Sequence, residues 1–267
     1  MTSKTVPDHL GLLNRFVASA STKLILLSQK IAALEAESIL REEGRVPRMP
    51  IEFRSQYGED VFIWDILERP MGGFFIEVGA FDGYSYSTTY ALEALGWTGL
   101  LIEAIPERAA QCAMRRRGSR VVQAALSAPG SPPTARFHLA KDVYGGMLSH
   151  MPVGPLRSAK LDADGIVRSP IEVPVKTMDE LLEGHEVGID VAVIDVEGHE
   201  VPLLRGFDLE RHRPRILLIE DNNTERDEAL SAYMGTKPYT QVAWVGVSRA
   251  FAHNDFAPEA QRRLRRF

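Results

Sequence analysis

The stretch FFIEVGAFDGYSYSTTYALEALGWTGLLIEAIPE, from Phe74 to Glu107, decides the fold class. An apolar segment, Phe74–Val78, runs into a glycine turn and then into a helical pattern. A second apolar segment, Gly99–Ile102, follows and ends in an acid. Short apolar runs separated by helical patterns are typical of buried parallel strands. The stretch therefore predicts a strand–helix–strand unit whose turn lies at the ligand-binding edge of a sheet.

The same alternation continues along the chain. Further strands are expected at Val121–Ala125, Val191–Ile194 and Ile216–Ile219, and QVAWVGVSRAFAH (241–253) predicts a hairpin that closes one edge. We therefore expect an α/β fold with a doubly wound, mostly parallel seven-stranded sheet over residues 51–267. Residues 127–172 are rich in Gly, Pro and Ser, and we interpret them as a lid or substrate loop.

Residues 1–50 are expected to form an N-terminal helical extension, which GRVPRMP (44–50) ends. Apolar side chains at alternating steps of three and four fall on one stripe of this helix: Val17, Ala20, Leu24, Leu27, Ile31 and Leu34. The stripe fits a helix packed on its own domain, or one that associates with a second copy or a partner. A membrane-surface helix is disfavoured, because Lys23 and Lys30 alone make a thin basic face.

Composition narrows the function classes. The net charge of −5 over 267 residues argues against a nucleic-acid partner, whose phosphates need a basic surface. The single cysteine, Cys112, excludes an internal disulfide and a cysteine metal cluster. That usage fits a cytoplasmic location. No run approaches the roughly 18 apolar residues of a membrane span.

The turn after the first strand indicates the ligand. Gly79 and Gly83 have G-x-x-x-G spacing, and not the G-x-G-x-x-G that holds a pyrophosphate. Glu77 and Asp82 would repel a diphosphate but suit a ligand that carries positive charge. S-adenosylmethionine carries an ammonium, a sulfonium and no phosphate, and Glu103 ends the second strand where a ribose is usually held. S-adenosylmethionine is therefore favoured, with a nicotinamide nucleotide as the alternative.

These residues, together with SQYGED (55–60), PVKTMDELL (174–182) and DVAVIDVEGHEVPLLRGF (190–207), resemble the FkbM-type S-adenosylmethionine-dependent methyltransferases. The resemblance covers about residues 51–253 and implies a Rossmann-like class I methyltransferase fold. It also implies a cofactor site made of Gln56, Glu77, Gly79, Asp82, Gly83, Ser87, Glu103, Ala104, Ala125 and Asp195. Within that site Glu103 would hold the ribose, and Gln56 and Ser87 would lie near the carboxylate end of the cofactor.

Two oxygen-rich clusters, VIDVEGHE (193–200) and LLIEDNN (217–223), follow two later strands, so they are expected at one edge of the sheet. In one mechanism a metal site of Asp195, Glu220 and Asp221, with Asn222, holds Mg²⁺ and activates an acceptor hydroxyl. In the other, His199 or Glu197 acts as general base, with Asp195 as a further catalytic residue. The sequence leaves both mechanisms open.

Relatives in this family mostly methylate hydroxyls of sugars or natural products. We therefore expect an O-methyltransferase that acts on a sugar, an oligosaccharide or a glycosylated metabolite, with Tyr144, Met147 and Met151 offering apolar contact to the acceptor. The alternatives are an O-methyltransferase of a non-sugar natural product, and a non-catalytic scaffold that the N-terminal helix docks onto a biosynthetic complex.

Overall fold

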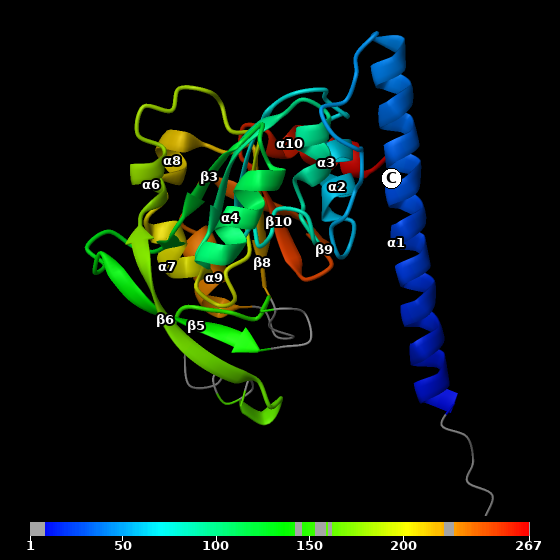
Figure 1. The fold of residues 1–267 in the computed structure, drawn as a ribbon. Coiled ribbons are helices and arrows are strands. Elements are labelled where there is room, and N and C mark those ends of the chain that lie inside the picture. The colour runs from blue at the N-terminus through cyan, green and yellow to red at the C-terminus, as the bar shows by residue number, and fades with distance from the viewer. Residues whose placement is uncertain (1–8, 142–145, 153–158, 160–161, 222–226, 267) are drawn as a thin grey trace, which may run out of the picture.

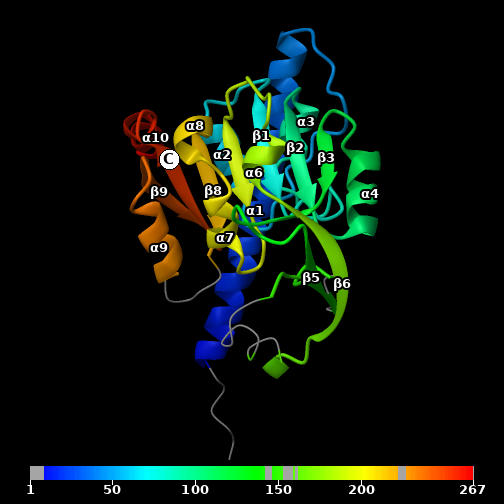
Figure 2. The ribbon, with the colours of Figure 1, turned by 90° about the vertical axis from the view of Figure 1, so that its left-hand side faces the viewer.

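The computed structural model describes residues 9–141, 146–152, 159, 162–221 and 227–266, and of residues 9–16 the backbone alone. Its main sheet has the strand order β3-β2-β1-β7-β8-β10-β9. The strands are β1 (Phe74–Val78), β2 (Thr98–Glu103), β3 (Arg120–Gln123), β7 (Val191–Ile194), β8 (Ile216–Glu220), β9 (Tyr239–Val245) and β10 (Ser248–His253). Only β10 and β9 run antiparallel to their neighbours in this sheet. The predicted doubly wound, mostly parallel sheet of seven strands is confirmed. Figure 2 shows β2 and β3 on one side of β1, and β8 and β9 on the other.

Helices cover both faces of this sheet. They are α1 (His9–Glu42), α2 (Glu59–Ile66), α3 (Tyr90–Ala94), α4 (Pro106–Arg115), α6 (Met178–Leu181), α7 (Glu200–Arg205), α8 (Leu209–His212), α9 (Glu228–Met234) and α10 (Ala257–Leu264). Side chains alternate along each strand, so Phe75 of β1 packs with α2, α3 and α10, whereas Ile76 packs with α6 to α9. Buried on both faces, the strands carry the near-continuous apolar runs from which they were predicted.

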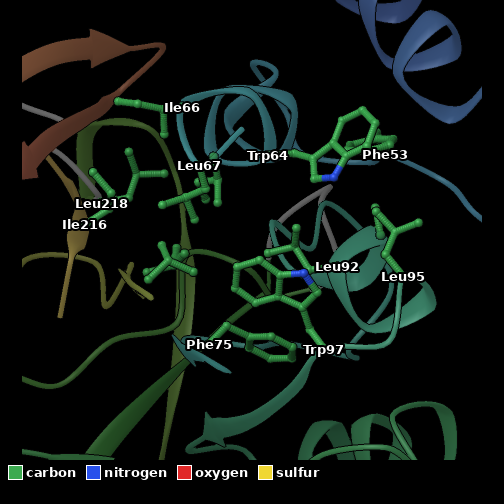
Figure 3. Close-up of a cluster of buried hydrophobic side chains, with 14 of the residues drawn as sticks. Phe53, Trp64, Ile66, Leu67, Phe75, Leu92, Leu95, Trp97, Ile216 and Leu218 are labelled. Atoms are coloured by element: carbon green, nitrogen blue, oxygen red, sulfur yellow. The ribbon is translucent and has the colours of Figure 1, made fainter. Parts of the chain in front are cut away.

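The face under α2 and α3 holds the larger aromatic side chains. Figure 3 shows Trp64 beside Phe53 and Trp97 beside Phe75. The Trp97 indole N–H donates to the Pro70 carbonyl at 3.1 Å, so its polar atom keeps a partner inside the core. A fully buried side chain of this kind contributes about 1.5–3 kcal/mol. This packing holds β1, and with it the beginning of the turn after Val78, in place.

A second, smaller sheet has the order β4-β6-β5, with β4 at Ala125–Leu126, β5 at Thr134–Lys141 and β6 at Val167–Lys176. Figure 1 shows β5 and β6 as a ribbon that projects from the main sheet. The segment predicted as a lid or substrate loop, residues 127–172, therefore contains β5 and the first part of β6. Pro170 and Pro174 lie within β6, opposite His138 and Thr134 of β5.

Helix α1 packs on the domain with a face other than its aliphatic stripe. Figure 1 shows it as a long helix along one side of the molecule, next to α2 and α3. Its buried residues are Gln29, Ala32, Ala36 and Leu40, and the Gln29 amide donates to the Ser55 carbonyl at 2.8 Å. The large aliphatic residues of the predicted stripe are exposed instead. None of the described helices has the length and apolar character needed to cross a membrane.

Candidate active site

The carboxyl ends of β1 and β7 meet at the point where the strand order reverses, which is where ligands bind in open α/β sheets. Gly79 follows β1 and Asp195 follows β7. The Asp195 backbone N–H donates to the Val78 carbonyl at 3.1 Å. Gly79 has φ +85°, and the Asp195 carbonyl occupies the space that a β-carbon at position 79 would need. Only glycine lets the two strand ends approach this closely.

A pocket opens beside Gly79, between the ends of β1 and β2 and the small sheet. The main-sheet side of its wall consists of Val78, Gly79, Phe81, Ile102, Glu103, Ala104 and Ile105. The remaining wall consists of Ala124, Ala125, Leu126, Phe137, Gly146, Met147, Ser149, Met151, Asp195, Val196, Glu197 and His199. We call it the donor pocket. Five residues predicted for the cofactor lie in its wall: Gly79, Glu103, Ala104, Ala125 and Asp195.

Glu103 is the acid at the end of β2. The Phe81 and Ile105 backbone N–H groups each donate to its carboxylate at 2.8 Å. Burial raises the pKa of Glu103 to about 7, and the two backbone hydrogen bonds counteract part of that rise. Its carboxylate is therefore fixed in direction at the pocket wall and changes charge near neutral pH.

Phe81 is a pocket residue that sequence reasoning missed. Its φ of +49° lies in the left-handed region that non-glycine residues rarely adopt. The Arg108 guanidinium carbon lies 4.3 Å from the centre of its ring. Strained residues of this kind concentrate at ligand sites. The sequence signal that could have found Phe81 is its position between Gly79 and Gly83 in the turn after β1.

Glu77 and Ser87, which were also predicted at the cofactor, lie beneath the turn and outside the donor pocket. The Glu77 carboxylate accepts hydrogen bonds from the Ser87 hydroxyl, the Thr88 backbone N–H and the Thr89 hydroxyl. The Arg116 guanidinium lies 3.5 Å from the same carboxylate, and both side chains are buried. This buried network holds the segment after the turn in place.

Asp82 and Gly83 have a similar structural role. Asp82 accepts hydrogen bonds from the backbone N–H groups of Tyr84 and Ser85, and it forms an ion pair with Arg115 at 2.6 Å. Gly83 packs on α4, where a β-carbon would come within 2.7 Å of the Cys112 sulfur. The structure thus places both residues in the support of the turn and not in the pocket wall.

A second cleft adjoins the donor pocket at the ends of β7 and β8. It is lined by Gln56, Tyr57, Tyr86, Met147, Leu148, Asp195, Glu197, Glu220 and Val247. We call it the acceptor cleft. Met147, Asp195 and Glu197 line both spaces, so these three residues mark their boundary. Gln56, predicted at the cofactor, lines only the acceptor cleft of the two.

Three carboxylates gather in the acceptor cleft. Asp195, Glu197 and Glu220 each offer an oxygen, and these oxygens lie within 4.8 Å of one another. Oxygen ligands at this spacing suit a hard divalent cation. Glu197, predicted as a base, joins Asp195 and Glu220 here. Its φ of +57° is again strained.

Asp221, predicted as the third metal ligand, lies apart from this group. Its side chain is fully buried and forms an ion pair with Arg249 at 3.2 Å. It also accepts a hydrogen bond from the Asp227 backbone N–H. Arg249 belongs to β10, so the pairing joins the end of β8 to its neighbour β10. Sequence reasoning had no means of finding this distant partner.

His199 lies at the N-terminal end of α7 and in the wall of the donor pocket. Its Nε2 lies 3.2 Å from the Ser127 hydroxyl oxygen. Burial lowers the pKa of His199 from its usual value near 6.5, because the charged imidazolium is desolvated. The ring is therefore neutral at pH 7 and able to accept a proton.

Glu200, the residue after His199, stabilises the turn that carries Asp195 and Glu197. Its carboxylate accepts hydrogen bonds from the Gly198 N–H at 3.0 Å and the Val196 N–H at 3.4 Å. Burial, and to a smaller extent the charge of Asp195, raise the pKa of Glu200 to about 7, although its backbone hydrogen bonds counteract part of the rise. A buried side chain thus holds the acidic turn in shape.

The segment 146–152 covers the donor pocket. His138 of β5 and His150 exchange backbone hydrogen bonds of 2.8 and 3.0 Å. The Ala140 N–H donates to the Ser149 hydroxyl at 2.9 Å. These bonds hold Met147 and Met151, predicted as apolar contacts for the acceptor, against the donor pocket. Tyr144, predicted as a further acceptor contact, and Asn222, predicted with the metal site, lie outside the described residues.

The chain is similar to known methyltransferases. A family model described as a methyltransferase FkbM domain matches residues 77–243. No curated protein sequence matches the chain. Among solved structures, an O-methyltransferase from Bacillus cereus in complex with SAH has a TM-score of 0.43 and 13% identity, over 88% of this chain and 99% of that one.

Two further solved structures are similar at the same level. The N-terminal domain of human METTL16 in complex with SAH has a TM-score of 0.41 and 15% identity, over 83% of this chain and 80% of that one. A TehB-like SAM-dependent methyltransferase from Corynebacterium glutamicum has a TM-score of 0.40 and 14% identity, over 85% of this chain and 97% of that one.

Proposed function

The chain belongs to the FkbM methyltransferase family, and from this premise we propose that it is an O-methyltransferase that moves the methyl group of S-adenosylmethionine to a hydroxyl of a sugar, an oligosaccharide or a glycosylated metabolite. One observation carries the proposal. Asp195 and Glu197 line both the donor pocket and the acidic acceptor cleft, so a methyl group held in one space would face a hydroxyl held in the other. Cysteine usage favours the cytoplasm as the site of this reaction.

The donor pocket suits the parts of S-adenosylmethionine. The ionised Glu103 carboxylate would accept hydrogen bonds from the two ribose hydroxyls, as an acid at this strand end commonly does. Ala104 and Ala125 leave room for the adenine ring between the strand ends. Asp195, at the boundary of the two spaces, would attract the positively charged sulfonium.

The transfer itself needs a base and an aligned oxygen. The acceptor oxygen attacks the methyl carbon, the carbon–sulfur bond breaks, and its electron pair stays on sulfur to give S-adenosylhomocysteine. The hydroxyl proton would go to Nδ1 of the neutral His199 ring, directly or through one water. Ser127 would orient that ring by accepting a hydrogen bond from its Nε2–H. Positioning supplies much of the rate in a displacement of this kind.

In a second form of the reaction, a bound cation would assist the transfer. Asp195, Glu197 and Glu220 would hold a divalent ion such as Mg²⁺. When bound, that ion would lower the pKa of the acceptor hydroxyl. Three carboxylates this close repel one another, so a cation among them would also relieve their charge.

The acceptor cleft favours a polyhydroxylated compound. Its carboxylates and the Gln56 amide can accept hydrogen bonds from several hydroxyls. The rim carries Tyr57 and Tyr86, and Tyr86 is 49% exposed with a strained φ of +57°. An exposed tyrosine at a polar cleft offers an apolar face with a polar tip, which suits the amphipathic face of a sugar ring.

Calorimetric titration of metal-stripped protein tests the proposal. S-adenosylmethionine is titrated first, and then sugars, oligosaccharides and hydroxylated aglycones are titrated into the saturated protein, with and without Mg²⁺. Donor binding with heat from a sugar supports the proposal, and dependence on Mg²⁺ selects the cation-assisted form. Heat from aglycones alone would favour a non-sugar natural product.

Self-association through α1 is a separate proposal, because it rests on the outer face of that helix.

A further inference from the structure

Helix α1 is apolar on two opposite faces. Its inner face, with Ala32, Ala36 and Leu40, is buried against the domain. At about 100° per residue, the aliphatic stripe falls on the opposite side of the helix. The outer side chains and their exposed fractions are Val17 53%, Leu24 66%, Leu27 54%, Ile31 47% and Leu34 66%. A helix that is apolar on both sides is ordinarily buried on both sides.

The spacing of the outer stripe matches a coiled-coil seam. Steps of three and four run from Val17 through Ala20 and the four central residues Leu24, Leu27, Ile31 and Leu34. The central spacing of three, four and three is the same in either direction. A second copy of the helix in antiparallel orientation therefore presents a matching pattern. Leu24 meets Leu34 of the second copy and Leu27 meets Ile31 of the second copy, about a two-fold axis level with position 29.

The charges beside the stripe select the same arrangement. Lys23, Lys30 and Glu37 flank one edge of the seam, and all three are exposed. Antiparallel pairing sets Lys23 opposite Glu37 of the second copy, twice by symmetry. Parallel pairing would instead bring Glu37 close to Glu42 of the second copy, and would offer Lys30 only Glu35 of the second copy, a side chain that already pairs with Arg69 of its own domain at 3.1 Å. Antiparallel pairing does place Lys30 beside its own copy at the axis, where both long side chains reach solvent.

We propose that α1 forms an antiparallel pair with α1 of a second copy of this chain, which makes the protein a two-fold symmetric dimer. The inner face of each helix stays on its own domain, so each domain remains attached to the helix pair from outside. A closed two-fold interface of this kind needs only one self-complementary patch. The inference rests on the outer face of α1 and does not depend on the reaction in the cleft.

Light scattering of the full chain after size-exclusion chromatography tests the pairing. We expect a mass close to twice the 29.7 kDa of one chain. The double variant Leu27→Asp, Ile31→Asp should raise the dissociation constant at least tenfold and keep the melting temperature of the domain. Leu26→Asp is the matched control, because Leu26 is 52% exposed on the same helix but lies off the seam. It should leave the dimer intact.

Two further variants test the orientation. Lys23→Glu should weaken the dimer, and adding Glu37→Lys should restore it. The native Cys112 is buried, so a surface cysteine can report on contacts. Lys30→Cys, exposed and beside its own copy at the axis, should crosslink to that copy through a short bis-maleimide. Leu24→Cys should not, because it lies about 15 Å from its copy in an antiparallel pair.

Several outcomes would overturn the inference. They are a monomeric mass at tens of micromolar protein, a dimer that Leu27→Asp, Ile31→Asp leaves unchanged, and crosslinking through Leu24→Cys but not Lys30→Cys. Binding of the monomer to anionic phosphatidylserine vesicles, abolished by the same double variant, would identify a membrane face instead.

Discussion

Gly79 and Asp195 lie in direct contact at the ends of β1 and β7, with the Asp195 carbonyl filling the space above the Gly79 α-carbon. This contact joins the donor pocket to the acceptor cleft. The contact also brings the turn after β7, which carries the strained and charged Glu197, beside the turn after β1. Small changes at position 79 should therefore affect folding and donor binding together.

Gly79→Ala should destabilise the protein by more than its backbone strain alone, which is about 1–3 kcal/mol. The added methyl group must push Asp195 away, so affinity for S-adenosylmethionine should also be lost. Gly130→Ala is the matched control, since Gly130 has φ +79° but open space around its α-carbon. Thermal unfolding and calorimetry measure the two effects. Equal losses of stability in both variants would contradict the close contact.

The affinity for S-adenosylmethionine should depend on pH through Glu103. Its pKa is about 7 in the free protein, and the ionised form is the one that accepts hydrogen bonds from a ribose. Below pH 7 the carboxyl is protonated, and binding must release that proton. The dissociation constant should therefore rise about tenfold for each unit by which the pH falls below 7. Glu103→Gln should bind weakly at every pH. Glu107→Gln, an exposed neighbour, should behave as the wild type. A flat profile for the wild type would refute this role of Glu103.

His199→Gln should lower kcat by about 10²–10⁴ and leave donor affinity within a few-fold. The wild-type kcat should rise with pH through a midpoint below 6.5 and then level, because burial lowers the pKa of His199 and the neutral ring is the active form. Ser127→Ala should cost less, since Ser127 only orients the ring. A pH–rate profile that survives unchanged in His199→Gln would show that another group takes the proton.

Raising the pH should increase the stability of Glu200→Gln relative to that of the wild type. The pKa of Glu200 is about 7 when folded and near 4.5 when unfolded, so its contribution to stability is complete below pH 4.5 and is lost as the pH rises through 7. That loss is roughly 3 kcal/mol at most. The melting temperature of Glu200→Gln relative to the wild type should therefore increase by several degrees between pH 5 and pH 9. The exposed Glu183→Gln should show no such trend.

Asp195→Asn should reduce methyl transfer at least about 100-fold while the protein stays folded, because the side chain is exposed and only its charge is removed. Treating the wild type with EDTA separates the two mechanisms. Lost activity that Mg²⁺ restores supports the cation-assisted form, and unchanged activity supports His199 alone. Normal transfer by Asp195→Asn would place the acceptor elsewhere.

The main sheet could be predicted from the sequence because its strands are buried on both faces and therefore read as short apolar runs. Phe74–Val78 and Val191–Ile194 have the bounds predicted for them. The small sheet was missed because β6 carries Pro170 and Pro174, and proline normally argues against a strand. Its strands also alternate between a pocket wall and solvent, so no apolar run marks them.

The candidate site was predictable in its location but only partly in its members. Acids that directly follow strands reach the same edge, and Asp195, Glu197 and Glu220 do so. Asp221 follows β8 directly after Glu220. It nevertheless pairs with Arg249, a partner that only the fold brings close.

The N-terminal helix shows a related limit of sequence reasoning. Large aliphatic residues dominate the pattern, whereas α1 packs on its domain through Ala32 and Ala36, whose small side chains allow a close approach. A search for the most hydrophobic stripe therefore finds the outer face of the helix.

Methyl transfer from S-adenosylmethionine with a labelled methyl group tests the central claim most directly. The protein is incubated with labelled donor and a panel of sugars, oligosaccharides and hydroxylated metabolites, and the product is analysed by mass spectrometry and by its stability to alkali. We expect an alkali-stable methyl ether on a hydroxyl, formed by the wild type and lost in His199→Gln. A methyl group on nitrogen or in an alkali-labile ester, or tight donor binding with no transfer across the whole panel, would contradict the account.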